Sequence, residues 1–163
     1  MEDPCMTVSR RAVLKPIGTV GALSIAGCLR SYSDGQHGGG DRVDEKGDIE
    51  VVIDGSPVNL SEDRFQAEHA DNTSMDFHLH ESDDHWYMEG ERRVTFAEAM
   101  DLLPYFEYTR QNDDHVIAFD GTDYDEGDPG TTITFIVNGD EVEPTDYTLQ
   151  DGDDLLVEIT TED

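Results

Sequence analysis

The stretch that decides the fold is Ile133–Ile159, ITFIVNGDEVEPTDYTLQDGDDLLVEI. It opens with β-branched and aromatic residues and reaches Asn138-Gly139, a dipeptide suited to a type I′ hairpin turn because both turn residues need positive φ. It closes with residues 155–160, in which Leu155, Val157 and Ile159 stand at every second position, and this spacing predicts a strand with one buried face. Just before that strand, Leu149-Gln-Asp-Gly-Asp predicts a tight turn.

Two other β-rich runs end in the same kind of turn dipeptide. They are residues 49–55, IEVVIDG, and residues 115–121, HVIAFDG. The first run also aligns without gaps to residues 133–139, ITFIVNG. This match has two interpretations: an internal duplication, or two independent hairpins that need the same kind of turn dipeptide. We prefer the second interpretation because turn chemistry explains most of the match.

One helix is predicted after Thr95. Thr95 and Glu98 have the spacing of a capping box, in which each residue satisfies a free backbone N–H at the start of a helix. Apolar residues then recur with helical spacing at Phe96, Ala99, Met100 and Leu103. Pro104 is expected to end the helix. Strands combined with this helix predict an α+β fold, a small mixed β-sheet with one main helix.

The segment 133–159 resembles the C-terminal half of the ubiquitin-like β-grasp sulfur carriers of thiamine and molybdopterin synthesis. The shared features are the Val-Asn-Gly turn, a valine or proline a few residues later, and Leu-x-Asp-Gly-Asp before the last strand. This resemblance implies a β-grasp-like fold. Sulfur carriers react through a terminal Gly-Gly, whereas this sequence ends Thr161-Glu162-Asp163, so their activity is not expected here.

The N-terminal residues predict where the protein resides. Arg10 and Arg11 directly precede a short apolar run, residues 13–27, that ends at Cys28 after Ala-Gly. This order resembles a twin-arginine export signal followed by a lipobox, in which the cysteine accepts lipid. The alternative is an uncleaved helical anchor, but the run is broken by proline and glycine and is shorter than the about 20 apolar residues that span a bilayer.

These features predict three regions. Residues 1–27 form a signal peptide, and residues 28–47, rich in glycine, serine and charge, form a flexible tether. Residues 48–163 form a single α+β domain. We therefore expect the domain to be held by lipid on Cys28 at the extracytoplasmic face of the cell membrane.

The charge of the chain is strongly negative. The chain has 39 acidic and 10 basic residues and a formal net charge of −29. Such a charge repels itself in dilute buffer, but at about 1 M salt the Debye length falls to about 3 Å. The composition resembles that of haloarchaeal proteins, and it argues against nucleic-acid binding, which requires a basic surface. An acidic disordered chain is the alternative interpretation, which the patterned C-terminal half disfavours.

Cysteines and glycosylation motifs add two smaller points. Cys5 lies in the predicted signal peptide and Cys28 is the predicted lipid acceptor, so no disulfide is expected in the domain. Asn59 and Asn72 each begin an N-glycosylation motif, a tripeptide that also occurs often by chance.

One group of residues is a candidate for metal chemistry. His78, His80 and His85 lie in two short runs around a loop. A regular hairpin would place His80 opposite His85 and His78 opposite Tyr87, and the three histidines would share the face opposite the apolar residues. Three imidazoles on one face suit zinc or copper(II). The alternative is that this is only the solvated face of an amphipathic hairpin. His69 and His115 would join the group only if the fold brings them near.

These observations favour a lipid-anchored cell-surface binding or accessory module of a halophilic archaeon, with a transition metal held by the histidine hairpin. The first alternative is a metal-dependent hydrolase that uses the same three histidines. The second is a protein-interaction module without metal, which would bind a partner through a sheet edge. The sequence contains no Gly-x-Ser-x-Gly elbow and no phosphate-binding loop pattern, so binding is favoured over catalysis.

Overall fold

The computed structural model of the chain describes residues 42–71, 73–81, 83 and 85–162. The predicted export signal at Arg10 and Arg11, the lipid acceptor Cys28, most of the tether and Asn72 lie outside the described residues. Within these ranges the chain forms two β-sheets and one α-helix, which confirms the α+β class in its broad sense.

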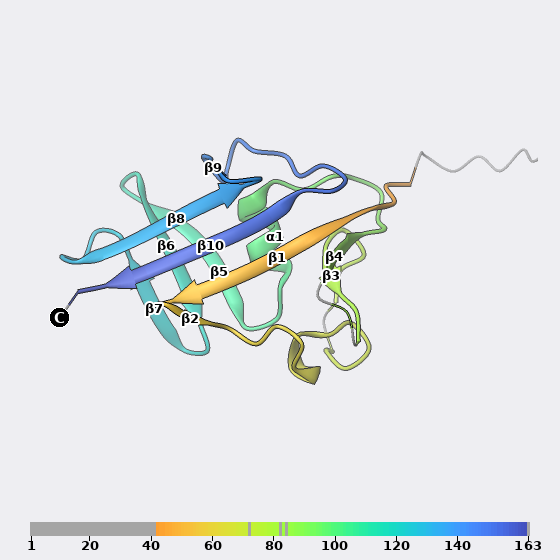
Figure 1. Cartoon of the computed structure of the whole chain (residues 1–163), viewed down its shortest axis with the longest axis horizontal. Coiled ribbons are helices and arrows are strands. Elements are labelled where there is room, and N and C mark those ends of the chain that lie inside the picture. Colours follow the sequence, from red (N-terminus) through yellow and green to blue (C-terminus); the bar gives the residue numbers. More distant parts are fainter. Residues whose placement is uncertain (1–41, 72, 82, 84, 163) are drawn as a thin grey trace, which may run out of the picture. The chain divides into compact units, whose positions relative to one another are not determined.

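The larger sheet has the strand order β3-β4-β1-β10-β8-β9, and β2 pairs with the end of β1. Its strands are β1 (Glu45–Ile53), β2 (Ser56–Pro57), β3 (His78–Leu79), β4 (His85–Met88), β8 (Thr131–Val137), β9 (Asp140–Glu141) and β10 (Asp154–Thr161). Figure 1 shows β1, β10 and β8 side by side across the front of the view. The first and last strands, β1 and β10, are parallel, with Val51 opposite Val157, whereas the other neighbours are antiparallel.

The smaller sheet consists of β5 (Phe106–Gln111), β6 (Asp114–Phe119) and β7 (Thr122–Asp125). All three predicted turn dipeptides join adjacent antiparallel strands and have positive φ at both residues: Asp54-Gly55 at 49° and 72°, Asp120-Gly121 at 51° and 82°, and Asn138-Gly139 at 54° and 88°. The predicted hairpins are therefore confirmed. A fourth turn, Asn112-Asp113, also has positive φ at both residues and joins β5 to β6.

The helix α1 (Phe96–Leu102) begins and ends as predicted. The Thr95 hydroxyl accepts from the Glu98 N–H at 3.2 Å, and the Glu98 carboxylate accepts from the Thr95 N–H at 2.9 Å, which completes the capping box. In Figure 1 the helix lies behind the larger sheet. Its Phe96 ring meets the Phe135 ring of β8 edge to face, with centroids 5.2 Å apart. The helix therefore closes the core over one face of the sheet.

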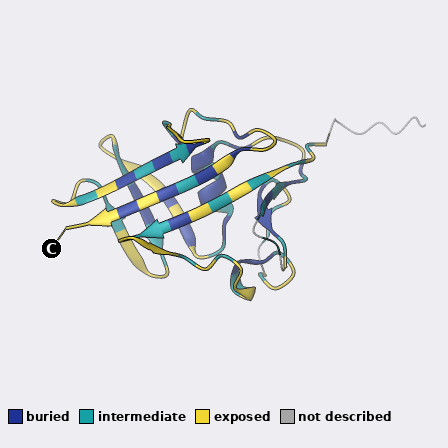
Figure 2. Ribbon diagram, in the orientation of Figure 1, coloured by how far each residue is buried: buried dark blue, intermediate teal, exposed yellow. Residues whose placement is uncertain are grey.

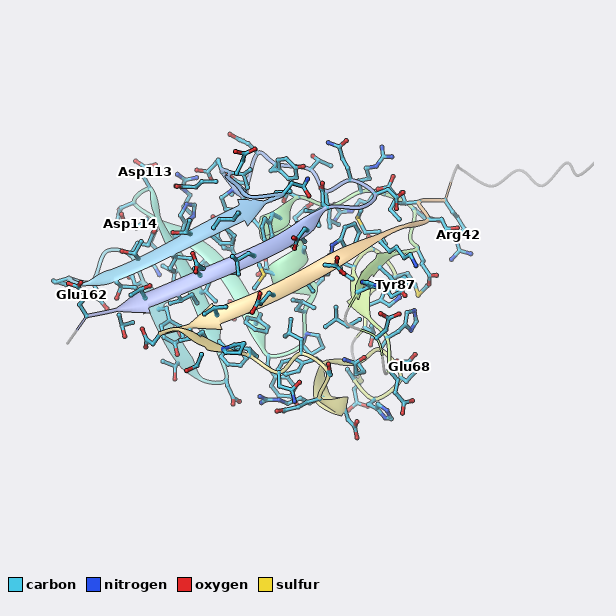
Figure 3. All side chains as sticks on the ribbon, in the orientation of Figure 1. Arg42, Glu68, Tyr87, Asp113, Asp114 and Glu162 are labelled. Atoms are coloured by element: carbon cyan, nitrogen blue, oxygen red, sulfur yellow. The ribbon has the colours of Figure 1, made fainter. Side chains whose placement is uncertain are left out.

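The last strand has the predicted buried face. Leu155, Val157 and Ile159 are at most 1% exposed, and Figure 2 shows buried and exposed residues alternating along β10. The preceding turn is held by the buried Asp153 carboxylate, which accepts from the Gln150 N–H at 2.9 Å. Figure 3 shows side-chain oxygen atoms around much of the ribbon, in keeping with the acidic composition.

The first strand begins at Glu45, earlier than the predicted run that starts at Ile49. Residues 45–48 form an antiparallel ladder with β4, in which Glu45 is opposite Met88. The polar run gave no strand signal by itself, because its extended conformation depends on this pairing with a distant segment. No helix in the described part of the chain is long and apolar enough to cross a membrane.

Candidate metal centre

The β3–β4 hairpin presents two faces of opposite character. Its register places His78 opposite Tyr87 and Leu79 opposite Trp86, as the sequence predicted. The apolar face is formed by Phe77, Leu79, Trp86 and Met88, each at most 2% exposed. Because strand side chains alternate between faces, the histidines are directed to the opposite side. The core thus fixes the backbone that carries them.

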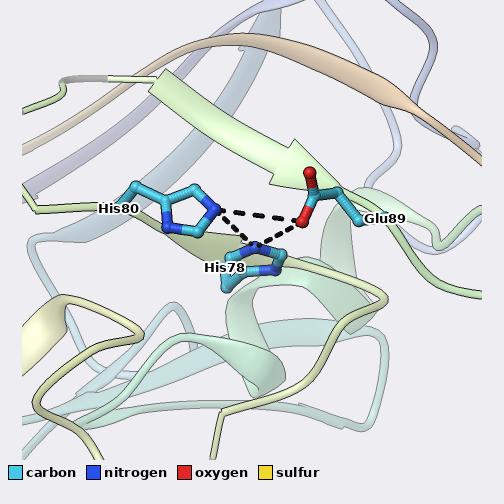
Figure 4. A group of neighbouring side chains, drawn as sticks. All are labelled: His78, His80 and Glu89. Carbon is cyan, nitrogen blue, oxygen red and sulfur yellow. Dashed lines mark hydrogen bonds and ion pairs between the residues drawn. The ribbon is translucent and has the colours of Figure 1, made fainter.

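Three side chains converge on that opposite face: His78, His80 and Glu89 (Figure 4). The two Nε2 atoms of His78 and His80 are 3.1 Å apart. The Glu89 Oε2 atom lies 3.6 Å from the His78 Nε2 and 3.9 Å from the His80 Nε2. The structure therefore directs one ligand atom from each residue toward a common point, in a group that could hold a metal ion.

The group extends from the protein interior to the surface. The His78 side chain is 1% exposed, whereas His80 and Glu89 are 35% and 38% exposed. Burial, followed by the nearby His80, lowers the pKa of His78, so this imidazole is held in the neutral form that binds metals. Solvent can reach the common point from the side of His80 and Glu89.

Each imidazole already has a partner for its other nitrogen. The His78 Nδ1 lies 3.0 Å from the main-chain oxygen of Ser74, and the His80 Nδ1 lies 2.7 Å from the Glu68 Oε1 atom. A carbonyl oxygen can only accept, so the His78 Nδ1 carries a proton. The bond to His80 lowers the pKa of Glu68, which is therefore an acceptor as well. Partners of this kind orient metal-binding histidines and select their tautomer.

Tyr87 forms the side wall of the group. Its ring centroid lies 4.8 Å from that of His80 and 6.2 Å from that of His78. Its hydroxyl donates to the Asp83 Oδ2 atom at 2.6 Å, and this bond raises the pKa of Tyr87 to about 12. Figure 3 shows Tyr87 and Glu68 in the part of the molecule that contains the hairpin. Tyr87 therefore remains neutral and restricts the rotation of both imidazoles.

The structure does not bring His85 into this group. β3 ends at Leu79, so the predicted pairing of His80 with His85 is absent, and His85 pairs with Asp48 of β1 instead. The His85 Nδ1 lies 2.5 Å from the Asp48 Oδ1 atom. The third ligand position is occupied by Glu89, which lies two residues beyond Tyr87. Strand alternation could have identified it, because residues 87 and 89 share a face.

The other two candidate histidines also lie elsewhere. The His69 Nε2 is 3.8 Å from the Glu81 carboxylate. His115 lies on β6, where its Nδ1 is 2.8 Å from the Tyr108 hydroxyl. Neither belongs to the group of His78, His80 and Glu89.

Two imidazoles and one carboxylate form a ligand set that is common for zinc and leaves a fourth position for water or another ligand. No protein family, curated protein or solved structure matches the chain. What the chain binds is therefore inferred from the geometry and charge of its own residues.

Proposed function

We propose that the protein is a lipid-anchored binding or accessory module on the extracytoplasmic face of the membrane of a halophilic archaeon, and that it holds zinc or copper(II) at His78, His80 and Glu89. The location is supported by the N-terminal pattern that ends at Cys28 and by the acidic composition. The metal is supported by the geometry of the three side chains.

The observation that carries the proposal is the short approach of the two Nε2 atoms. With both Nδ1 atoms acting as donors, to Ser74 and Glu68, the neutral forms of His78 and His80 each have an unprotonated Nε2, and these two atoms lie 3.1 Å apart. Two lone pairs at this distance repel unless a proton or a metal ion lies between them. The position therefore attracts a cation, and Glu89 adds negative charge beside it.

The distances fit a metal of the expected size. Zinc–nitrogen bonds of about 2.0–2.1 Å at a tetrahedral angle separate two ligand atoms by about 3.3 Å. The two imidazole nitrogens are 3.1 Å apart, and the Glu89 oxygen lies slightly farther away, at 3.6 and 3.9 Å. Because Glu89 is 38% exposed, a small side-chain rotation can bring its carboxylate to the metal.

The test measures bound metal in the full chain. The protein is purified in high salt, loaded with zinc or copper(II), and dialysed against excess Mg²⁺ so that surface carboxylates do not retain the metal. We expect one tightly bound ion per chain, lost in the His78→Ala/His80→Ala variant and retained in His69→Ala, the matched exposed-histidine control. Equal metal content in the wild type and the double variant contradicts the proposal. Hydrolysis of ester, phosphate or peptide substrates that depends on the bound metal would favour the hydrolase instead.

We also propose that the fold is β-grasp-like. The proposal is supported by the adjacent parallel strands β1 and β10, by α1 on one face of the sheet, and by the turn before β10. Proton–proton contacts between Val51 and Val157, measured by NMR in solution, test the central pairing. A register without these contacts contradicts the proposal.

A further inference from the structure

The two imidazoles of the metal group are held in different ways. His78 is fixed by a main-chain carbonyl, that of Ser74, and no side-chain substitution removes this acceptor. His80 depends on the carboxylate of Glu68, which lies twelve residues earlier in the chain. The tautomer of His78 is therefore set by the backbone, whereas that of His80 is set by one side chain.

Glu68 itself is held firmly in position. Its Oε1 atom lies 2.7 Å from the His80 Nδ1, and its Oε2 atom accepts from the main-chain N–H of Glu81 at 3.0 Å. The adjacent Ala67 N–H donates to the Leu79 carbonyl at 2.8 Å, so the segment that carries Glu68 runs along the outer side of β3. Both carboxylate oxygens thus face groups of His80 and Glu81, the two residues that directly follow β3. The lowered pKa of Glu68 keeps it ionised as an acceptor.

We infer that Glu68 is the positioning residue of the metal centre: it keeps the proton of His80 on Nδ1 and thereby leaves the Nε2 lone pair free for the metal. The inference rests on the proposed metal-binding function. Without this acceptor, the proton of His80 would move to Nε2 and donate to the His78 Nε2, which lies only 3.1 Å away. The two rings would then be joined by a hydrogen bond from the His80 Nε2–H to the His78 Nε2. Neither Nε2 atom would keep a free lone pair for a metal ion.

The consequence for binding is substantial. Loss of such an outer partner costs about 10–100-fold in metal affinity in characterised sites. Here the cost includes breaking the new hydrogen bond between the two imidazoles before a metal can enter. Glu68 is 42% exposed, so its truncation leaves no cavity in the core.

The first measurement uses the metal-free full chain, labelled with ¹⁵N and held at about pH 8, above the ordinary imidazole pKa of about 6.5. Long-range ¹H–¹⁵N correlation spectra distinguish the two tautomers of each histidine. We expect the proton of His80 on Nδ1 in the wild type and on Nε2 in Glu68→Ala, with His78 unchanged. Glu81→Ala is the matched control, since it removes a neighbouring carboxylate but leaves its backbone N–H in place.

The second measurement is zinc affinity by competition with a chelator of known affinity. We expect a 10–100-fold loss in Glu68→Ala and no loss in Glu81→Ala. A His80 proton that stays on Nδ1 in Glu68→Ala overturns the inference, as does an unchanged zinc affinity. A wild type that binds no zinc at His78 and His80 refutes the proposed function instead, and the tautomer spectra still decide whether Glu68 positions the ring.

Discussion

Gly47 occupies a position in β1 where a larger residue should not fit. A Cβ atom at Gly47 would lie 2.1 Å from the main-chain oxygen of Asp153 and 2.9 Å from the indole carbons of Trp86. Trp86 is fully buried and paired opposite Gly47 in the ladder between β1 and β4. The Gly47→Ala substitution should therefore force apart β1 and β4, the strands that join the β3–β4 hairpin to the rest of the larger sheet.

The size of the effect follows from the groups that must move. The Asp153 oxygen accepts from the Trp86 Nε1–H and from the Asp48 N–H, each at 3.1 Å. Each weakened hydrogen bond costs about 1 kcal/mol, and overpacking a filled core costs about 1–3 kcal/mol. The gain from a stiffer unfolded chain is about 0.4–1 kcal/mol. We expect the free energy of unfolding to fall by about 3 kcal/mol.

Gly55→Ala is the matched comparison. Gly55 has a positive φ of 72° but no atom within 4 Å of the added Cβ, so only backbone strain of about 1–2 kcal/mol applies. Urea unfolding of both variants in high salt, followed by Trp86 fluorescence, should place Gly47→Ala clearly below Gly55→Ala in stability. A Gly47→Ala protein that is as stable as Gly55→Ala would refute the close packing of β1 against Trp86 and Asp153.

Three further predictions follow from the capping box, the buried imidazole and the net charge. Thr95→Ala should lower the free energy of unfolding by about 1 kcal/mol, because it removes the hydroxyl that caps α1, whereas Thr109→Ala on the exposed side of β5 should change it little. Urea unfolding measures both variants, and equal effects would contradict a stabilising role of the Thr95 cap. The pKa of His78 is lower in the folded protein than in the unfolded chain, so between these two values the unfolded chain binds more protons. Stability of the metal-free protein should therefore fall as the pH drops below about 6.5, and a His78→Gln variant should lose this part of the pH dependence; an identical pH profile for both proteins would count against the buried neutral imidazole. The net charge is −29, and raising NaCl from about 0.1 M to about 1 M shortens the Debye length from about 10 Å to about 3 Å. The urea midpoint should therefore increase with salt, and a constant midpoint would show that charge repulsion does not destabilise the fold.

Local signals in the sequence were sufficient to predict several hairpin turns, the start of the helix and the faces of the strands. The Asp-Gly and Asn-Gly dipeptides specified three hairpins, because positive φ at both residues is a property of the turn itself. The Thr95–Glu98 spacing specified the start of α1, because a cap satisfies backbone groups within one turn of helix. Alternation placed His78 and His80 on one face and Leu79 on the other.

The group formed by His78, His80 and Glu89 was predicted only in part. His78 and His80 are two residues apart in one short run, so their shared face follows from strand geometry. Glu89 replaced His85 because β3 is short and because β1 supplies Asp48 as a partner for His85. The length of a strand and the identity of its neighbours depend on long-range pairing, which alternation does not report.

The sequence by itself determined the turns, the helix, the alternating faces of the strands and the acidic character of the surface, because each depends on residues close together in the chain or on composition alone. Only the tertiary structure decided that β1 lies parallel to β10, that His78 is buried, and that Glu68 reaches His80. These arrangements join segments separated by between twelve and more than one hundred residues. Their physical basis is the burial of one shared apolar core. The spacing of residues along the chain does not indicate which distant segments pack together in that core.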